Sequence, residues 1–337
     1  MQQVAEVLRR SVDEGRAAVV GRVIALKGFS TLPVDELVAI DDTGGFHGDL
    51  LGRTGAEKLE AAASSMLSGA GRLETVHVSI HGPTVKELGL ACGGQADVLL
   101  QPADSIPAQV WSLLAARAPV AMVTVIDGHA AGPDAIAVDR EGQTWGRLAD
   151  GAAAVAGGLA DEAKGLLGEG RTTSRRVETE AGVALVEAWV PSPRLVVVGS
   201  GEVVTAIAAQ AALLGWETRD TDRPEVEELL DWAGATAALV VLSHDPHIDV
   251  PALSAGLGRP TPYIGAMGSR GTQSRRLDRL AAEGIPAEQL DRIHRPIGLN
   301  LGGRRAPEVA LAIVAEILAV HCGRDARPLR DSSGPIH

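Results

Sequence analysis

A glycine turn, Gly199-Ser200-Gly201, follows an apolar run at 194–198 and precedes an alanine-rich segment. A strand, a glycine turn and a helix in this order build a nucleotide-phosphate site. Glycine lets the backbone approach a phosphate, and the start of the helix offers free N–H groups with the positive end of the helix dipole. Asp222 follows about 20 positions later, where a carboxylate suits a ribose hydroxyl. The alternative is a turn with a purely geometric role, because Val204 replaces the third glycine of the dinucleotide pattern.

A second group of polar residues follows the third strand-like run of the same half. His244 and Asp245 begin the segment His-Asp-Pro-His-Ile-Asp, which ends at Asp249. Open α/β sheets bind ligands at the carboxyl ends of their strands, where this segment would lie. An imidazole beside a carboxylate can act as a general base, so His244 and Asp245 are the candidate catalytic residues. A polar surface loop is the alternative, and the spacing of further ligands does not favour a metal.

Gly268-Ser269-Arg270 repeats the order of strand, glycine and helix. Ser269 can cap the helix that follows, and arginines at 270, 275, 276 and 279 fall on that helix. Arginines near a helix start suit a second phosphate, so Gly268, Ser269 and Arg270 are predicted to contact one. A solvated basic face of the helix is the alternative.

The first half contains one segment with reactive chemistry, Cys92-Gly93-Gly94. A thiol followed by two glycines is expected on an exposed turn, where a thiolate binds a soft metal or accepts sulfur. The alternative is a buried cysteine that packs as a small apolar side chain. The flanking glycines favour the exposed turn.

Composition excludes several classes of protein. The net charge of −12 disfavours nucleic acids and anionic membranes as partners, and aromatic residues at 2% are too few for base-stacking platforms. No apolar stretch reaches the roughly 18 residues that span a bilayer. The first residues lack the basic start and apolar core of a secretory signal, and two cysteines cannot form a disulfide framework. We therefore expect a cytoplasmic protein.

These segments need elements to position them, and the pattern of strands and helices predicts two domains. Residues 1–190 mix strands and helices without regular alternation, which predicts an N-terminal α+β domain. Pro191-Ser192-Pro193 marks the boundary, because proline disrupts strand pairing. Residues 191–322 alternate strand and helix, with predicted helices at 249–257 and 307–321 and a last predicted strand at 262–266. This pattern predicts a Rossmann-type parallel α/β domain. The polar tail at 323–337 is expected to be disordered.

The chain resembles the XdhC/CoxI family, the accessory factors of xanthine and carbon monoxide dehydrogenases that handle the molybdenum cofactor. In the first half, Gly89-Leu-Ala-Cys-Gly-Gly94 is similar to the family's Cys-Gly-Gly turn. In the second half the resemblance is carried by Val196-Val-Val-Gly-Ser-Gly201, Ser243-His-Asp245, Tyr263-Ile-Gly-Ala-Met-Gly-Ser-Arg270, Arg295-Pro-Ile-Gly-Leu-Asn300 and Ala306-Pro-Glu-Val-Ala-Leu-Ala-Ile-Val-Ala-Glu-Ile317.

The resemblance implies a binding protein that holds the molybdenum cofactor (molybdopterin), keeps it while a terminal ligand is exchanged for sulfur, and passes it to an apo-enzyme. Cys92 would then contact the molybdenum, and the Rossmann half would accommodate a nucleotide or the pterin phosphate. The implied partners are an apo-molybdenum hydroxylase of the xanthine or carbon monoxide dehydrogenase type and a cysteine desulfurase. A homodimer has precedent in the family.

Two segments depart from the family pattern. The family's Ser-Gly-Gly-Cys-x-Glu stretch is replaced by Leu51-Gly-Arg-Thr-Gly-Ala-Glu57, which has no cysteine. The family's Gly-Ser-x-Pro-Arg loop is replaced by Gly28-Phe-Ser-Thr-Leu-Pro33, which lacks the arginine.

Two other functions stay open at this point. Gly199, Gly201 and Asp222 also suit an NAD(P)-dependent oxidoreductase, for which the aspartate favours NAD because it repels a 2′-phosphate. A scaffold that docks partners without binding a small ligand is the third hypothesis. The sequence favours an accessory protein over an enzyme.

Overall fold

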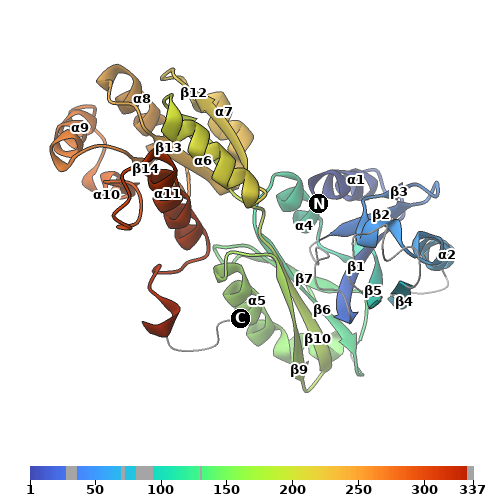
Figure 1. Cartoon of the computed structure of the whole chain (residues 1–337). Coiled ribbons are helices and arrows are strands. Elements are labelled where there is room, and N and C mark those ends of the chain that lie inside the picture. Colours follow the sequence, from blue (N-terminus) through green and yellow to red (C-terminus); the bar gives the residue numbers. More distant parts are fainter. Residues whose placement is uncertain (28–35, 70–72, 81–93, 130, 332–337) are drawn as a thin grey trace. The chain divides into compact units, whose positions relative to one another are not determined.

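The computed structural model describes all residues except 28–35, 70–72, 81–93, 130 and 332–337. The chain divides into two units, Met1–Val190 and Pro191–His337 (Figure 1). The break between them falls at the start of the Pro-Ser-Pro segment.

The first unit contains two antiparallel five-stranded sheets, sheet A and sheet B. Sheet A has the order β3-β2-β1-β5-β4 and sheet B the order β8-β7-β6-β10-β9. The strands of sheet A are β1 (Ala18–Lys27), β2 (Leu37–Asp41), β3 (Phe46–His47), β4 (Glu74–Ile80) and β5 (Gly94–Pro102). Those of sheet B are β6 (Val120–Asp127), β7 (Ala135–Val138), β8 (Thr144–Gly146), β9 (Thr173–Thr179) and β10 (Gly182–Trp189).

Apolar side chains hold the two sheets together. One core combines residues of both sheets with α1 (Gln2–Asp13) and α4 (Ala108–Ala115), and Trp111 and Met122 are fully buried in it. The opposite face of sheet A is covered by α2 (Ala56–Leu67), and that of sheet B by α5 (Ala156–Gly168). Successive strand residues point to opposite faces, so the central strands contribute apolar side chains to the cores on both sides of each sheet.

A buried polar cluster interrupts the core between the sheets. The Arg22 side chain on β1 donates two hydrogen bonds from Nε to Glu187 on β10, at 2.8 and 3.1 Å, and its Nη2 donates to Gln101 on β5 at 2.7 Å. All three residues are at most 5% exposed. Burial raises the pKa of Glu187, and the Arg22 guanidinium opposes that shift. The cluster therefore joins the two sheets through one ion pair.

The turn between β2 and β3 is built around the Asp41 carboxylate. It accepts hydrogen bonds from the N–H and hydroxyl of Thr43 and from the N–H of Gly45, and its Oδ2 lies 2.8 Å from Nε2 of His47. Burial raises the pKa of Asp41, but these hydrogen bonds outweigh burial and hold the pKa well below its ordinary value of 3.8.

We expect Asp41→Asn to lower the free energy of unfolding by roughly 1–3 kcal/mol at neutral pH, because the amide cannot replace the charged acceptor. A carboxyl whose pKa is depressed by folding stabilises the folded state above its unfolded pKa, and that contribution is lost as the pH falls. The difference in the free energy of unfolding between the wild-type protein and Asp41→Asn should therefore become smaller below about pH 4. Urea unfolding at several pH values measures it. The exposed neighbour provides a control, since Asp42→Asn should cost less than about 0.5 kcal/mol. A loss independent of pH would contradict the charge argument.

The second unit contains sheet C, whose five parallel strands have the order β12-β11-β13-β14-β15. The strands are β11 (Arg194–Val198), β12 (Glu217–Thr221), β13 (Ala237–Val241), β14 (Tyr263–Ala266) and β15 (Ile293–His294). The helices are α6 (Glu202–Leu213), α7 (Glu227–Ala233), α8 (Pro246–Leu257), α9 (Arg270–Ala282), α10 (Ala287–Leu290) and α11 (Ala306–His321).

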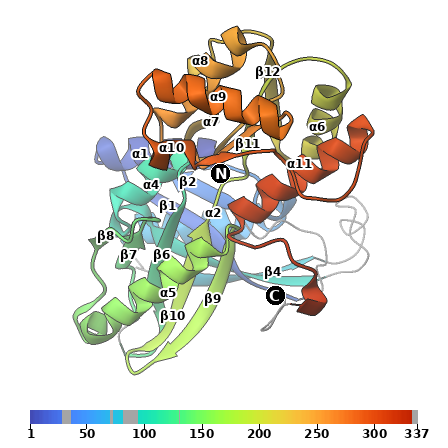
Figure 2. The same ribbon diagram turned by 90° about the vertical axis from the view of Figure 1, so that its left-hand side faces the viewer.

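Helices cover both faces of sheet C. α6 and α11 pack on one face around Ile207 and Ile313, and they lie side by side in Figure 1. α7, α8 and α9 pack on the other face around Leu230, Leu253 and Leu280, and Figure 2 shows α8 and α9 grouped apart from α6 and α11. The chain leaves β11 for β12 on one side and returns to β13 on the other. In such a sheet the ligand crevice lies at this reversal, outside the carboxyl ends of the strands.

The predicted fold class is confirmed: antiparallel sheets with helices come first and a parallel Rossmann-like sheet follows. Two local predictions were wrong. α8 starts at Pro246 rather than 249, because Asp245 caps it and Pro246 suits a first helical turn. β15 was missed because two residues are too short for a periodic signal. The predicted disorder of 323–337 stays a prediction, since 332–337 lie outside the described residues.

None of the described helices combines the length and apolar character that crossing a membrane requires.

Candidate functional site

The predicted glycine turn lies at the carboxyl end of β11, between the strand and α6. Gly199 has a φ of +144° and Gly201 a φ of +96° and a ψ of −166°, which are glycine conformations. A Cβ on Gly199 would lie 3.1 Å from Leu242, whereas a Cβ on Gly201 would meet nothing within 4 Å. The turn therefore leaves open space in front of the N-terminus of α6, where a phosphate can approach the backbone.

Asp222 lies one residue beyond the end of β12 and is exposed. β12 pairs with β11, and the carbonyl of Thr221 accepts a hydrogen bond of 2.8 Å from the N–H of Gly199. The backbone at Asp222 is therefore adjacent to the glycine turn. Val204, which replaces the third glycine, is 6% exposed and packs in the core beneath α6.

The second predicted segment follows β13. The Asp245 carboxylate accepts a hydrogen bond of 2.9 Å from the N–H of His247, so this candidate base caps α8. The side chain of His244 is exposed. His247 and Asp249 belong to the first turn of α8 rather than to a loop. Within this segment, the side chains of His244 and His247 are both exposed and available to a ligand.

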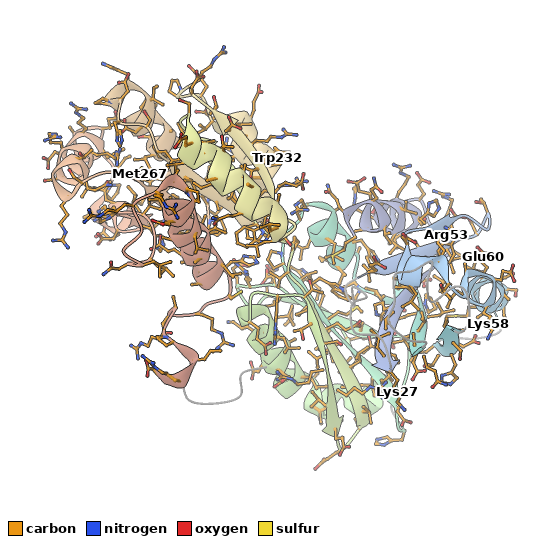
Figure 3. The ribbon with its side chains drawn as sticks, in the orientation of Figure 1. Lys27, Arg53, Lys58, Glu60, Trp232 and Met267 are labelled. Atoms are coloured by element: carbon orange, nitrogen blue, oxygen red, sulfur yellow. The ribbon has the colours of Figure 1, made fainter. Side chains whose placement is uncertain are left out.

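The third segment follows β14, whose end is marked by Met267 in Figure 3. Ser269 caps α9 by accepting a hydrogen bond from the N–H of Thr272 at 3.2 Å. Gly268 has a φ of +136°, and Arg270 is exposed at the start of the helix. The three segments thus follow three adjacent strands at one edge of sheet C.

Arg276, one of the four arginines noted on the helix that follows Ser269, forms contacts inside the protein. Arg276 is 3% exposed, and its Nε and Nη2 donate to the carboxylate of Asp249 on α8 at 2.9 and 2.5 Å. The idea that Arg276 belongs to a solvated or phosphate-binding face of α9 is therefore wrong. Sequence reasoning also missed Gln273, which is buried beside it. The sequence contained a signal for this burial, because Gln273, Arg276 and Leu280 are spaced three and four residues apart, as on one face of a helix.

The chemistry of this edge suits an anion. The N–H groups of His244 and Gly268 have no hydrogen-bond partner among the described residues, and the N-termini of α6 and α9 face the same edge. Within the described part of the chain, no three His, Cys, Asp or Glu side chains come close enough to hold a metal ion. Backbone N–H groups in this arrangement are chemically suited to a phosphate.

In the first unit, Cys92 and Gly93 lie outside the described residues. Gly94 is buried at the start of β5, opposite Ile80 on β4. Its neighbour Gln95 pairs with Lys27, which is labelled at the end of β1 in Figure 3. The described strands therefore place the start of β5 beside a lysine at the end of sheet A.

The segment that departs from the family pattern leaves no room for a thiol. With Glu57 as the shared acid, Gly55 takes the place of the family cysteine. Gly55 has a φ of +78°, and a Cβ there would lie 2.7 Å from Cγ1 of Val78. Leu51 nearby is 1% exposed and belongs to the core under α2. This segment serves packing.

Comparison with known proteins gives three findings. The family model described as the XdhC Rossmann domain matches residues 195–317. Two proteins of Escherichia coli K12 are similar: YqeB is 33% identical over 147 residues (38% of this chain, 27% of YqeB), and PaoD, described as a molybdenum cofactor insertion chaperone, is 31% identical over 136 residues (39% of this chain, 41% of PaoD). The chain therefore spans less than half the length of these relatives.

A solved structure from Bacillus halodurans, described as a xanthine dehydrogenase, is 20% identical with a TM-score of 0.49, covering 96% of this chain and 98% of that one. The family model spans the strands and helices of the second unit from β11 to α11, including all three segments at the edge of sheet C. The predicted resemblance is thus confirmed for the part of the chain that the model matches: residues 195–317 match the XdhC Rossmann domain.

Proposed function

We propose that this protein binds the molybdenum cofactor as cargo and inserts it into a molybdoenzyme of the xanthine or carbon monoxide dehydrogenase type. The observation that carries the proposal is an XdhC Rossmann domain with an open glycine turn at the crevice edge of its sheet, where the N–H groups of His244 and Gly268 have no partner among the described residues. The similarity to the chaperone PaoD supports the choice of cargo.

The proposal makes a separate prediction for each unit. The edge at Gly199–Gly201, His244 and Gly268 would hold a phosphate of the cofactor, because backbone N–H groups bind phosphate without adding a charged side chain. Thiolates are the protein ligands that suit soft metals, and we propose that one contacts the molybdenum. Gly55 has no room for one, so Cys92 is our proposed thiolate.

Titration of the purified full chain with isolated molybdenum cofactor, and separately with NADH, tests this proposal. We expect the cofactor to bind and Cys92→Ala to weaken its binding and the activation of an apo-dehydrogenase. Cys322→Ala is the matched control, because it removes the other cysteine, which lies directly after α11. If the Cys92→Ala protein delivered the molybdenum cofactor as well as the wild-type protein does, the Cys92 thiolate would not be a ligand of the molybdenum.

An NAD(P)-dependent oxidoreductase is the second candidate, favoured by Asp222 beside the glycine turn. This hypothesis predicts NADH binding that is lost in Asp222→Ala, together with steady oxidation of NADH by a small substrate. If the protein bound the molybdenum cofactor but did not bind NADH, the oxidoreductase hypothesis would be wrong.

The partners follow from the same proposal. The acceptor would be an apo-molybdenum hydroxylase, with a cysteine desulfurase as the sulfur donor and a cytoplasmic homodimer as the working form. Light scattering of the free protein, and of its mixture with each candidate partner, measures these associations directly.

A further inference from the structure

A buried polar cluster lies directly beneath the candidate site in the second unit. Asp249 on α8 and Gln273 and Arg276 on α9 are 3%, 5% and 3% exposed. The Arg276 guanidinium donates to the Asp249 carboxylate, and its Nη1 donates to the side-chain oxygen of Gln273 at 2.8 Å. Burying a charged pair costs desolvation energy, and one reason to retain such a pair is that it fixes one arrangement of the surrounding chain.

The same guanidinium holds two loop carbonyls. Its Nη2 donates to the carbonyl of Ser243 at 3.2 Å, and its Nη1 donates to the carbonyl of Met267 at 3.0 Å. Ser243 follows β13 and Met267 follows β14, and these strands are neighbours in sheet C. Arg276 therefore links two of the three segments that carry the candidate site.

These carbonyls determine where the next N–H groups point. The peptide bonds Ser243–His244 and Met267–Gly268 are trans, and in a trans peptide the C=O and N–H point in opposite directions. Both carbonyls point inward to one guanidinium, so the N–H groups of His244 and Gly268 point away from it. Neither N–H has a partner among the described residues.

We propose that Arg276, fixed by Asp249, is a positioning residue that turns the N–H groups of His244 and Gly268 outward to bind a phosphate group. This inference rests on the proposed function, because it takes the edge of sheet C as the place where a phosphate-bearing ligand binds. Arg276 does not touch the phosphate. Its five N–H groups are matched to the carboxylate, two carbonyls and an amide, an arrangement that a lysine ammonium cannot reproduce.

The test is titration of the full chain with ADP and with inorganic pyrophosphate, followed by amide chemical shifts in ¹⁵N spectra. In the wild-type protein we expect the His244 and Gly268 amides to shift most. Arg276→Lys should weaken binding about 10- to 100-fold, the effect of losing one or two hydrogen bonds to a charged group, and should abolish those two shifts. Pyrophosphate binding as tight as that of ADP would identify the phosphates as the recognised group.

Arg259→Lys is the matched control, because Arg259 pairs with Asp231 on an exposed face of the same unit. It should leave both affinities unchanged. If Arg276→Lys does not fold, Asp249→Asn is the second test. It keeps Arg276 and one side-chain oxygen that can accept its hydrogen bonds, and it should also weaken the binding of ADP and pyrophosphate. If the wild-type protein bound these ligands tightly and a folded Arg276 or Asp249 variant bound them with the same affinity, Arg276 would have no positioning role. The proposed function would then still stand. No binding of either ligand or of the cofactor by wild type would overturn both.

Discussion

Replacing Glu187 by alanine is expected to lower the free energy of unfolding of the first unit by about 3–5 kcal/mol. The loss is large because Arg22 is 1% exposed and would remain charged without its partner. Its Nε donates both of its hydrogen bonds to Glu187, and its Nη1 has no partner in the described structure. Arginine keeps its proton in proteins, so it cannot escape the cost by becoming neutral. Urea unfolding followed by circular dichroism measures the loss.

Two further variants separate an unpaired charge from a simple loss of contacts. The double variant Arg22→Met with Glu187→Leu removes both charges, and replacement of a buried pair by apolar residues is often neutral or stabilising. We therefore expect it to be more stable than Glu187→Ala. Arg16→Ala breaks an exposed ion pair with Glu14 and should cost less than about 1 kcal/mol. If the double variant were as unstable as Glu187→Ala, the unpaired charge would not explain the loss. The ion pair between Arg22 and Glu187 would then itself stabilise the fold.

Local patterns were sufficient to predict the strands, turns and helices that carry the candidate site of the second unit. The strand, the glycine turn and the helix follow one another in sequence, and so do the serine cap at 269 and its helix. Parallel strands place successive segments at one edge of a sheet, so the proximity of Gly199, His244 and Gly268 followed from the alternation of strand and helix alone.

Contacts between distant residues could not be predicted in the same way. Arg22 and Glu187 are 165 positions apart, and they meet only because two separate sheets share one core. The four arginines of α9 look alike in sequence, and burial of Arg276 depends on which face of the helix turns toward the sheet. Helical periodicity places Arg276 next to the apolar stripe, but the position of its partner Asp249 depends on how α8 and α9 pack.

Replacing Gly201 by alanine is expected to weaken binding of the molybdenum cofactor and of ADP by about 10- to 100-fold, the effect of losing one or two hydrogen bonds to a charged phosphate. The backbone of Gly201, at a φ of +96° and a ψ of −166°, is accessible essentially to glycine alone. Alanine would force the turn into another conformation and move the N–H groups that start α6. A Cβ added at Gly201 would meet no atom within 4 Å, so the variant should fold.

Gly215→Ala provides the matched control in the same unit. Gly215 follows α6, has a φ of +70° and also has open space in the direction of a Cβ. Both substitutions place alanine at a positive φ, at a cost in stability of about 1–2 kcal/mol for Gly215→Ala and about 1–3 kcal/mol for Gly201→Ala. Binding should weaken only for Gly201→Ala, as isothermal titration with both variants would show. If both variants bound the ligands as wild type does, the glycine turn would serve the geometry of the fold, and the phosphate would have to bind elsewhere on the chain.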